Sequence, residues 1–371
     1  MKQACLAAGL AACSTLCHAQ GGITLYGRFD AGISYTTGVR DAAGGRGNSW
    51  RGESGNWGAS WLGLSGDEGL GGGDAAFFAL EQGIDLMHGT GNAGPDVLFG
   101  RKSYVGYRSR DYGALRLGRD LSLGNYQWDM DPMMQELYSS TALMRWRNSS
   151  VINNAIGYQS PVLRGCDVFL QHSPGERPGA YNQGATGGYG RTDSIQLTYT
   201  GAALELRSQF SQFRDADGRF SNLFVASREA FAGVAYKLDG ATTLQAGYNH
   251  LSAPDTPAGL ADRADHGWLG AKVQATPHWL LSGALYHMRV TGGGGDATHD
   301  GAGRAILLAA GAMYLFSKNT FWYLSLAHVS NSTGAQFGVG ARNPGSDNGN
   351  LDNPAPGKAQ NGMYTGINAT F

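Results

Sequence analysis

Apolar and polar side chains alternate along many short stretches of this chain. The stretch ITLYGRFDAGISY (residues 23–35) places Ile23 and Leu25 on one face of an extended strand, and Arg28 and Asp30 on the other. Residues 113–120 and 241–250 alternate in the same way. Successive side chains of a strand point to opposite sides, so the charged face needs water and the apolar face needs lipid or a partner. We therefore expect Arg28 and Asp30 to face a water-filled bore.

Sixteen such strands are predicted from runs rich in aromatic and β-branched residues between Gly, Asn, Asp, Ser and Pro clusters. They cover residues 23–36, 58–67, 74–85, 98–109, 112–120, 150–159, 164–172, 192–200, 203–213, 228–238, 241–250, 266–275, 278–288, 304–316, 320–328 and 362–371. The connections between them alternate between long and short. This pattern places all long loops at one end of an antiparallel meander, as in outer-membrane barrels with short periplasmic turns.

The hydropathy pattern favours a barrel over membrane helices. The longest apolar run outside the N-terminus, AILLAAGAMYLF (residues 305–316), is too short for a membrane helix. A chain integral to a membrane must then cross it as a closed barrel. The segment 304–316 is apolar on both faces, which a water-filled bore does not explain. Aromatic residues near strand ends are expected to form interfacial girdles: Tyr26, Tyr35, Trp268, Trp279, Tyr286, Tyr314, Phe321, Trp322 and Tyr323.

The N-terminus has the features of a secretory signal. Lys2 precedes an apolar stretch, and small residues precede Gln20, so residues 1–19 are the expected signal peptide and 20–371 the barrel domain. A lipoprotein cleavage box ending at Cys13 is the alternative interpretation. Signal cleavage leaves Cys166 as the only cysteine, so no internal disulfide is expected. Basic and acidic residues are nearly balanced, with no basic stripe, so nucleic acid is not an expected partner.

Several motifs resemble one known family. GGITLYGRFDAGISYTTG at the start, GLSGDEGLGGGDAAFFALEQGID (63–85), FGRKSYVGYRSRDYGALRLGRD (99–120), RNSSVINNAIGYQSP (147–161) and the terminal NGMYTGINATF are similar to Gram-negative outer-membrane general porins of the β-proteobacterial type. The resemblance implies a homotrimer of sixteen-stranded barrels in the outer-membrane lipid. It implies passive diffusion of small hydrophilic solutes and ions through a pore narrowed by the third long loop, residues 121–149.

This loop is where we expect selectivity to arise. Carboxylates in or beside it are expected to face arginines across the constriction. The acidic candidates are Asp120, Asp129, Asp131 and Glu136; the basic candidates are Arg28, Arg101, Arg116, Arg119 and Arg147. Arg101 and Arg119 are included because FGRK and LGRD match family positions where arginine lines the pore, although simple alternation places Arg119 on the face of Leu117.

The expected filter is weak. Opposed acidic and basic rows partly cancel for an ion, and a charge about 10 Å away contributes only about 0.4–1.7 kcal/mol. The family often has arginine where this chain has Trp61 and Ser65, which also predicts a weaker anion preference. Ala369 replaces a larger residue near the C-terminus, which predicts weaker assembly.

No catalytic constellation is evident in the sequence. GLSGD (63–67) lacks the final glycine of a nucleophile elbow, and neither an H-E-x-x-H motif nor a pair of cysteines for zinc occurs. We expect no enzyme activity, cofactor or metal. The alternatives are a substrate-specific channel with Tyr126 and Trp128 along its path, a membrane hydrolase, an adhesin or phage receptor, and a soluble exported β-protein.

Overall fold

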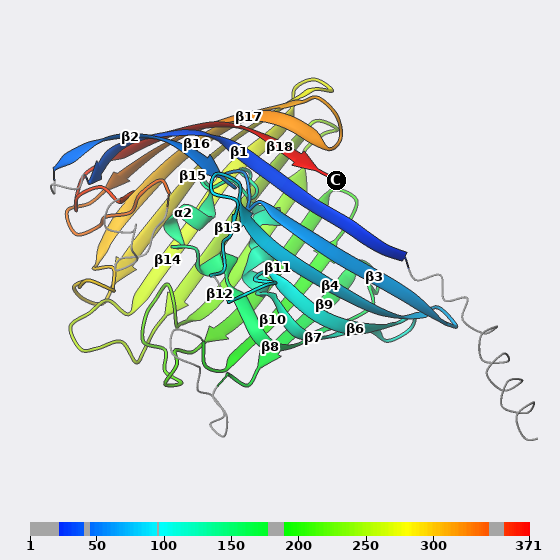
Figure 1. Cartoon of the computed structure of the whole chain (residues 1–371). Coiled ribbons are helices and arrows are strands. Elements are labelled where there is room, and N and C mark those ends of the chain that lie inside the picture. Colours follow the sequence, from blue (N-terminus) through cyan, green and yellow to red (C-terminus); the bar gives the residue numbers. More distant parts are fainter. Residues whose placement is uncertain (1–21, 41–44, 95, 177–188, 341–351) are drawn as a thin grey trace, which may run out of the picture.

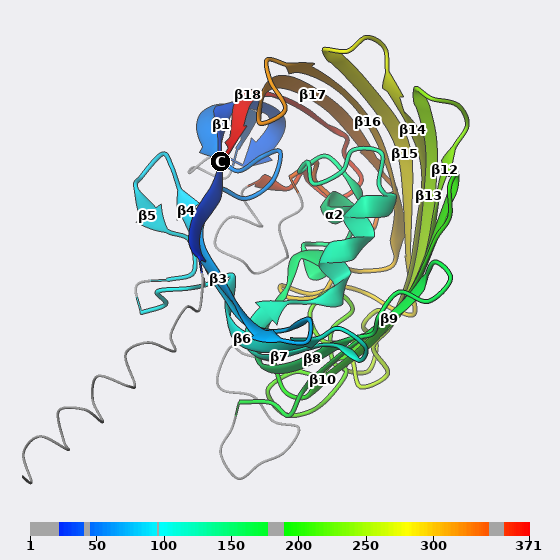
Figure 2. The same cartoon turned by 90° about the vertical axis from the view of Figure 1, so that its right-hand side faces the viewer.

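The computed structural model describes residues 22–40, 45–94, 96–176, 189–340 and 352–371. The expected signal peptide and its cleavage site lie outside these residues. Sixteen antiparallel strands close into a barrel because β1 pairs with β18 along one edge and with β2 and β3 along the other. Figure 1 shows the barrel from the side, and Figure 2 shows its rim and interior.

The predicted sixteen-stranded barrel is confirmed. Its strands are β1 (Gly22–Arg40), β3 (Trp61–Gly71), β4 (Asp74–Asp85), β6 (Lys102–Ser109), β7 (Gly113–Leu121), β8 (Val151–Gln159), β9 (Cys166–Ser173), β10 (Thr192–Thr200), β11 (Leu204–Phe213), β12 (Arg228–Lys237), β13 (Thr242–Ser252), β14 (Arg263–Gln274), β15 (Trp279–Thr291), β16 (Gly303–Leu315), β17 (Thr320–Asn331) and β18 (Gln360–Thr370).

Two further strands lie in segments that the sequence pattern assigned to loops. β2 (Arg46–Ser54) pairs with the second half of β1, and β3 pairs with the first half. The two-residue β5 (Thr90–Gly91) pairs with the end of β4. Both segments are rich in glycine and polar residues and have no apolar face. Backbone hydrogen bonds to the neighbouring β1 and β4 hold them in place.

Side-chain alternation is as expected on the outer face. Ile23, Leu25 and Ile33 are exposed on β1, whereas Arg28 and Asp30 point inward. Asp30, however, does not meet water. It is fully buried and accepts hydrogen bonds from the backbone N–H of Asn56 (2.8 Å) and the Tyr323 hydroxyl (2.8 Å). The segment between β2 and β3 covers it, which the alternation could not predict.

Only part of the predicted aromatic girdle exists. Trp279 is partly exposed near the short turns, and its ring contacts those of Tyr314 (5.0 Å) and Trp322 (6.3 Å). The other group, Trp268, Tyr286, Phe321 and Tyr323, points into the barrel and is buried. That prediction was wrong for this group because these residues pack beneath an inner loop. No helix in the described part of the chain is long and apolar enough to cross a membrane.

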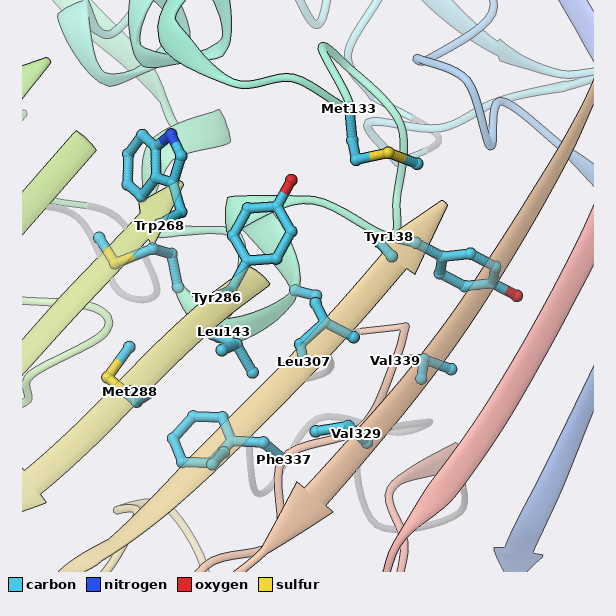
Figure 3. Packing of buried hydrophobic residues seen from close by; sticks show 14 of the residues in the cluster. Met133, Tyr138, Leu143, Trp268, Tyr286, Met288, Leu307, Val329, Phe337 and Val339 are labelled. Atoms are coloured by element: carbon cyan, nitrogen blue, oxygen red, sulfur yellow. The ribbon is translucent and has the colours of Figure 1, made fainter. Parts of the chain in front are cut away.

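The connection between β7 and β8 folds into the barrel, as Figure 2 shows. We call residues 122–150 the inner loop; it contains the 3₁₀ helices η1 (Leu123–Met130) and η2 (Arg147–Ser149) and the short helix α2 (Ser140–Leu143). Its buried Met133, Tyr138 and Leu143 belong to the same apolar cluster as residues on the inner faces of β14–β17 (Figure 3).

The inner loop explains why β16 is apolar on both faces. Ile306 and Leu308 are exposed on the outer surface, whereas Ala305 and Leu307 face inward and are buried in the cluster. One side of the barrel wall is therefore covered by protein rather than by water. The two sides of the bore have different chemistry, and this difference positions the functional site.

Candidate functional site: a basic passage beside the inner loop

The end of the inner loop is held to the barrel by two buried arginines. The guanidinium of Arg145 makes two contacts with the Asp300 carboxylate, at 3.1 and 2.5 Å, and lies over the Phe337 ring. Arg147 donates to the Ser227 carbonyl (2.9 Å) from a fully buried position. These contacts fix the loop on one side of the bore.

The loop carboxylates bind the wall beneath the loop. Asp129 pairs with Arg207 of β11 at 2.5 Å. Asp131 is fully buried and accepts from the Tyr286 hydroxyl at 2.5 Å. These two interactions hold the first half of the loop; the Asp131 side chain is buried, whereas that of Asp129 is 54% exposed.

Glu136 behaves in the same way. Its carboxylate accepts a hydrogen bond from the Ser325 hydroxyl of β17. Burial, with a further contribution from the nearby Asp131 and Asp30, raises the pKa of Glu136 to about 8. This carboxyl group is therefore mostly neutral at pH 7.

A cavity of about 320 Å³ remains between the inner loop and the opposite wall. The wall contributes Arg28, Arg101 and Arg119, and the loop contributes Asn125, Gln135, Trp146 and Glu136. A second cavity of about 390 Å³ on the side of the long loops shares Gly55, Asn56, Leu137 and Trp146 with the first. The two cavities adjoin along the uncovered wall, and we call them the passage; its second part carries Arg51 and the carboxylates of Glu53, Asp85 and Asp352.

Arg28 and Arg119 have only neutral hydrogen-bond partners among the described residues. Arg28 donates to Gln135 (2.7 Å) and to the Ala59 carbonyl (3.1 Å). Arg119 donates to the Gly100 carbonyl (2.7 Å) and to Asn153. Their positive charges are therefore not neutralised by an ion pair.

Gly58 is needed for the position of Arg28. Its φ of +150° is unfavourable for other residues, and a Cβ there would lie 2.5 Å from an Arg28 guanidinium nitrogen. The turn between β2 and β3 can approach the arginine this closely only because residue 58 has no side chain.

The other wall cations are partly compensated. Glu81 of β4 contacts both Arg101 (3.2 Å) and Lys102 (2.9 Å). Arg116 contacts Asp120 at 3.4 Å and lies over the Phe169 ring. One carboxylate shared by two cations leaves a net positive charge beside the cavity.

The structure brings together three of the five predicted arginines: Arg28, Arg101 and Arg119 line the cavity. Arg119 points inward despite the simple alternation because a β-bulge lies between Gly118 and Asp120. Arg116 lies on the same wall but outside this cavity. Arg147 is buried against β11 and β12, so it does not line the bore.

The acidic candidates are distributed differently from the prediction. Asp120 belongs to β7, not to the loop, and Asp131 has no exposed surface. Asp129 faces Arg207 rather than the predicted arginines. The expected opposition of an acidic row and a basic row across one constriction is therefore not found.

Sequence reasoning missed Glu81 and Arg207. Glu81 is in phase with the inward-facing Ala79 of β4, and Arg207 is in phase with Gln209 of β11. Strict alternation along these two strands identifies both as bore-facing. The family motifs used to choose the other arginines do not single out Glu81 or Arg207.

A closed barrel with a charged passage through its centre defines a channel protein. The model of the Gram-negative porin family matches residues 4–334, and the chain belongs to this family. It is an outer-membrane β-barrel that lets solutes diffuse passively through its pore. The family and the fold are those of channels rather than enzymes.

Solved structures show the same fold. An anion-selective porin from Comamonas acidovorans is 23% identical, with a TM-score of 0.75 over 95% of this chain and 100% of that one. OmpT of Vibrio cholerae in its trimer form is 12% identical, with a TM-score of 0.63 over 95% and 99% of the two chains. DcaP, an outer-membrane channel of Acinetobacter baumannii, is 12% identical, with a TM-score of 0.62 over 95% and 97%. No curated protein sequence matches this chain.

Proposed function

We propose that this porin is a diffusion pore that prefers anions. The observation that carries the proposal is the pair Arg28 and Arg119, which line the passage without a carboxylate partner among the described residues. Unpaired positive charges beside an aqueous path attract anions and repel cations.

The inner loop supports the same sign of selectivity. Asp129 pairs with Arg207 and lines neither cavity, Asp131 is buried, and Glu136 is mostly protonated at neutral pH. The loop therefore contributes little negative charge to the passage. We therefore expect a stronger anion preference than opposed acidic and basic rows would give. Trp61 and Ser65, which stand where the family often has arginine, add no charge to it.

No catalytic or cofactor role is proposed. Passive diffusion needs only an aqueous path and fixed charges, and these are the features that the arginines and the inner loop supply.

The proposed assembly is a homotrimer. Two observations support it: a structurally similar OmpT is recorded in a trimer form, and the connection that contains β5 projects away from the barrel in Figure 2. Conductance that appears in groups of three equal steps in a planar bilayer is the expected result. Single steps from protein that migrates as a monomer would contradict the trimer.

The zero-current potential under a tenfold KCl gradient tests the anion preference. We expect the potential to have the sign produced when chloride is more permeant than potassium. A potential of the opposite sign would contradict the proposal, and so would a value indistinguishable from that of free diffusion.

A substrate-specific channel is the second candidate. Trp128 and Trp146 line the passage, so aromatic side chains are available for one solute class. Current that is blocked by a solute in a saturable manner would favour this candidate. Current that only scales with salt concentration would favour general diffusion.

A further inference from the structure

The outer surface of β14–β16 carries an arginine cluster near the long loops. Arg263 on β14, Arg289 on β15 and Arg304 on β16 are all exposed. Arg289 and Arg304 lie directly opposite each other in the antiparallel pairing. Like charges at directly opposed positions destabilise a sheet, so this arrangement favours a bound anion.

The carboxylate nearest this cluster compensates only part of its charge. Asp265 lies opposite Arg289, but it accepts from the Tyr248 hydroxyl (2.6 Å) and contacts the His250 ring (2.9 Å). Across the part of the chain that the structure describes, neither Arg289 nor Arg304 has a carboxylate within ion-pair distance.

The neighbouring part of the same rim is different. Asp193 on β10 pairs with Arg191 (2.8 Å), Arg214 (3.2 Å) and His172 (2.8 Å). There the arginines have a protein partner. The uncompensated charge is thus a local property of β14–β16 and not of the rim as a whole.

The cluster lies at the level where lipid headgroups begin. Trp279, at the short-turn end of β15, and Arg289 are ten residues apart on this strand. Ten residues at about 3.4 Å each, tilted by about 35–45°, rise about 24–28 Å, which matches an apolar band about 25 Å tall. Arg289 therefore marks the outer edge of this band.

The surface below the arginines is apolar. Leu285 and Leu308 are about half exposed and lie directly opposite each other, four residues below the arginine pair on each strand. Leu269 on β14 is exposed beside Leu285. A row of arginines above a row of leucines complements a molecule with an anionic head and acyl chains.

We propose that Arg263, Arg289 and Arg304 bind the phosphate groups of a phosphorylated glycolipid in the outer leaflet of the outer membrane. Arginine matches phosphate because its planar fork can donate two parallel hydrogen bonds. A phosphate placed between Arg289 and Arg304 removes their repulsion, and the acyl chains cover the leucines.

The test is a titration of the purified full-length protein with bis-phosphorylated lipid A, followed by native mass spectrometry. The Arg289→Gln/Arg304→Gln variant is expected to bind at least about tenfold more weakly than the wild type. Lys318→Gln is the control, because Lys318 is also exposed but lies in the short turn between β16 and β17, at the opposite end of the barrel. The control is expected to bind as the wild type does.

Three results would overturn the proposal. The first is equal affinity of the double variant and the wild type. The second is equal affinity for dephosphorylated lipid A, or full competition by inorganic phosphate, which would indicate no specific lipid site. The third is a change of oligomeric state in the double variant, which would show that the arginines lie in an interface between copies of this chain.

A folding control keeps the result interpretable. The double variant should show wild-type conductance, because none of the substituted residues faces the bore. Should it fail to fold, the single Arg304→Gln variant is used, for which a partial loss of affinity is expected and an unchanged affinity would contradict the proposal.

Discussion

Arg145 and Asp300 form a fully buried ion pair between the inner loop and the connection of β15 to β16. The two side chains are 0% and 3% exposed and make two contacts, at 3.1 and 2.5 Å. Arg145 has a φ of +52°, an uncommon conformation for this residue. The ion pair therefore holds a strained end of the loop against the wall.

Asp300→Asn is expected to loosen this end of the loop. Removing one partner of a buried ion pair leaves an uncompensated charge and costs about 3–5 kcal/mol. We expect a lower thermal unfolding temperature and larger fluctuations of single-channel current. Asp296→Asn is the control, because Asp296 lies in the same connection but is 45% exposed and contacts His299 of that connection instead of the inner loop. Equal current noise in the two variants would show that the pair does not restrain the loop.

Gly311→Leu is expected to narrow the passage. A Cβ at residue 311 would lie 2.6 Å from the Ser282 hydroxyl and 3.2 Å from both Glu136 and Met133. A leucine side chain must push the inner loop toward the basic wall, so the single-channel conductance should fall. Gly283→Leu is the control, since the nearest atom to a Cβ there is 3.8 Å away. A conductance equal to that of the control would contradict the close contact.

Glu136→Gln should change how stability depends on pH. The folded pKa of Glu136 is raised from 4.5 to about 8, so its contribution to stability is complete below pH 4.5 and is lost as the pH rises through 8. Glutamine cannot ionise and lacks this loss. The unfolding temperature of the variant relative to the wild type should therefore rise between pH 4.5 and 8 and then level off. A difference that is constant with pH would contradict the assigned pKa.

Neutralising Arg28 and Arg119 should weaken the anion preference. Each charge changes the energy of an ion about 10 Å away by about 0.4–1.7 kcal/mol, a factor of about two to eighteen in its local concentration. The double variant Arg28→Gln/Arg119→Gln is expected to shift the zero-current potential toward that of free diffusion. Arg289→Gln, on the outer face of β15, should leave it unchanged. The account is contradicted if both variants retain the wild-type potential.

The sequence predicts the barrel well because its signals are local and repeated. Alternation and loop length are independent of distant contacts, so all sixteen strands were identified from them. β2 was missed because its residues, RGNSWRGES, are glycine-rich and polar and show no apolar alternation, although the strand forms a hairpin with the end of β1.

The site was harder to predict because charge alone does not show which wall a side chain faces. Glu136 is buried against Ser325 with a raised pKa, and Asp129 pairs with Arg207 rather than with the predicted arginines. Arg119 was included from a motif, and its inward direction depends on the bulge at Gly118. These are tertiary features with no signature of their own in the sequence.

Accessibility of single cysteines tests the central claim that solutes pass between the inner loop and the basic wall. Arg119→Cys and Ala309→Cys are each made in a Cys166→Ala background, and mass spectrometry confirms one thiol per chain. Residue 119 lines the cavity, whereas Ala309 is 6% exposed beneath the inner loop. A charged thiosulfonate added to an open channel should change the current of Arg119→Cys and leave that of Ala309→Cys unaffected. Modification of Ala309→Cys without modification of Arg119→Cys would place the passage on the wrong side of the loop and contradict the account.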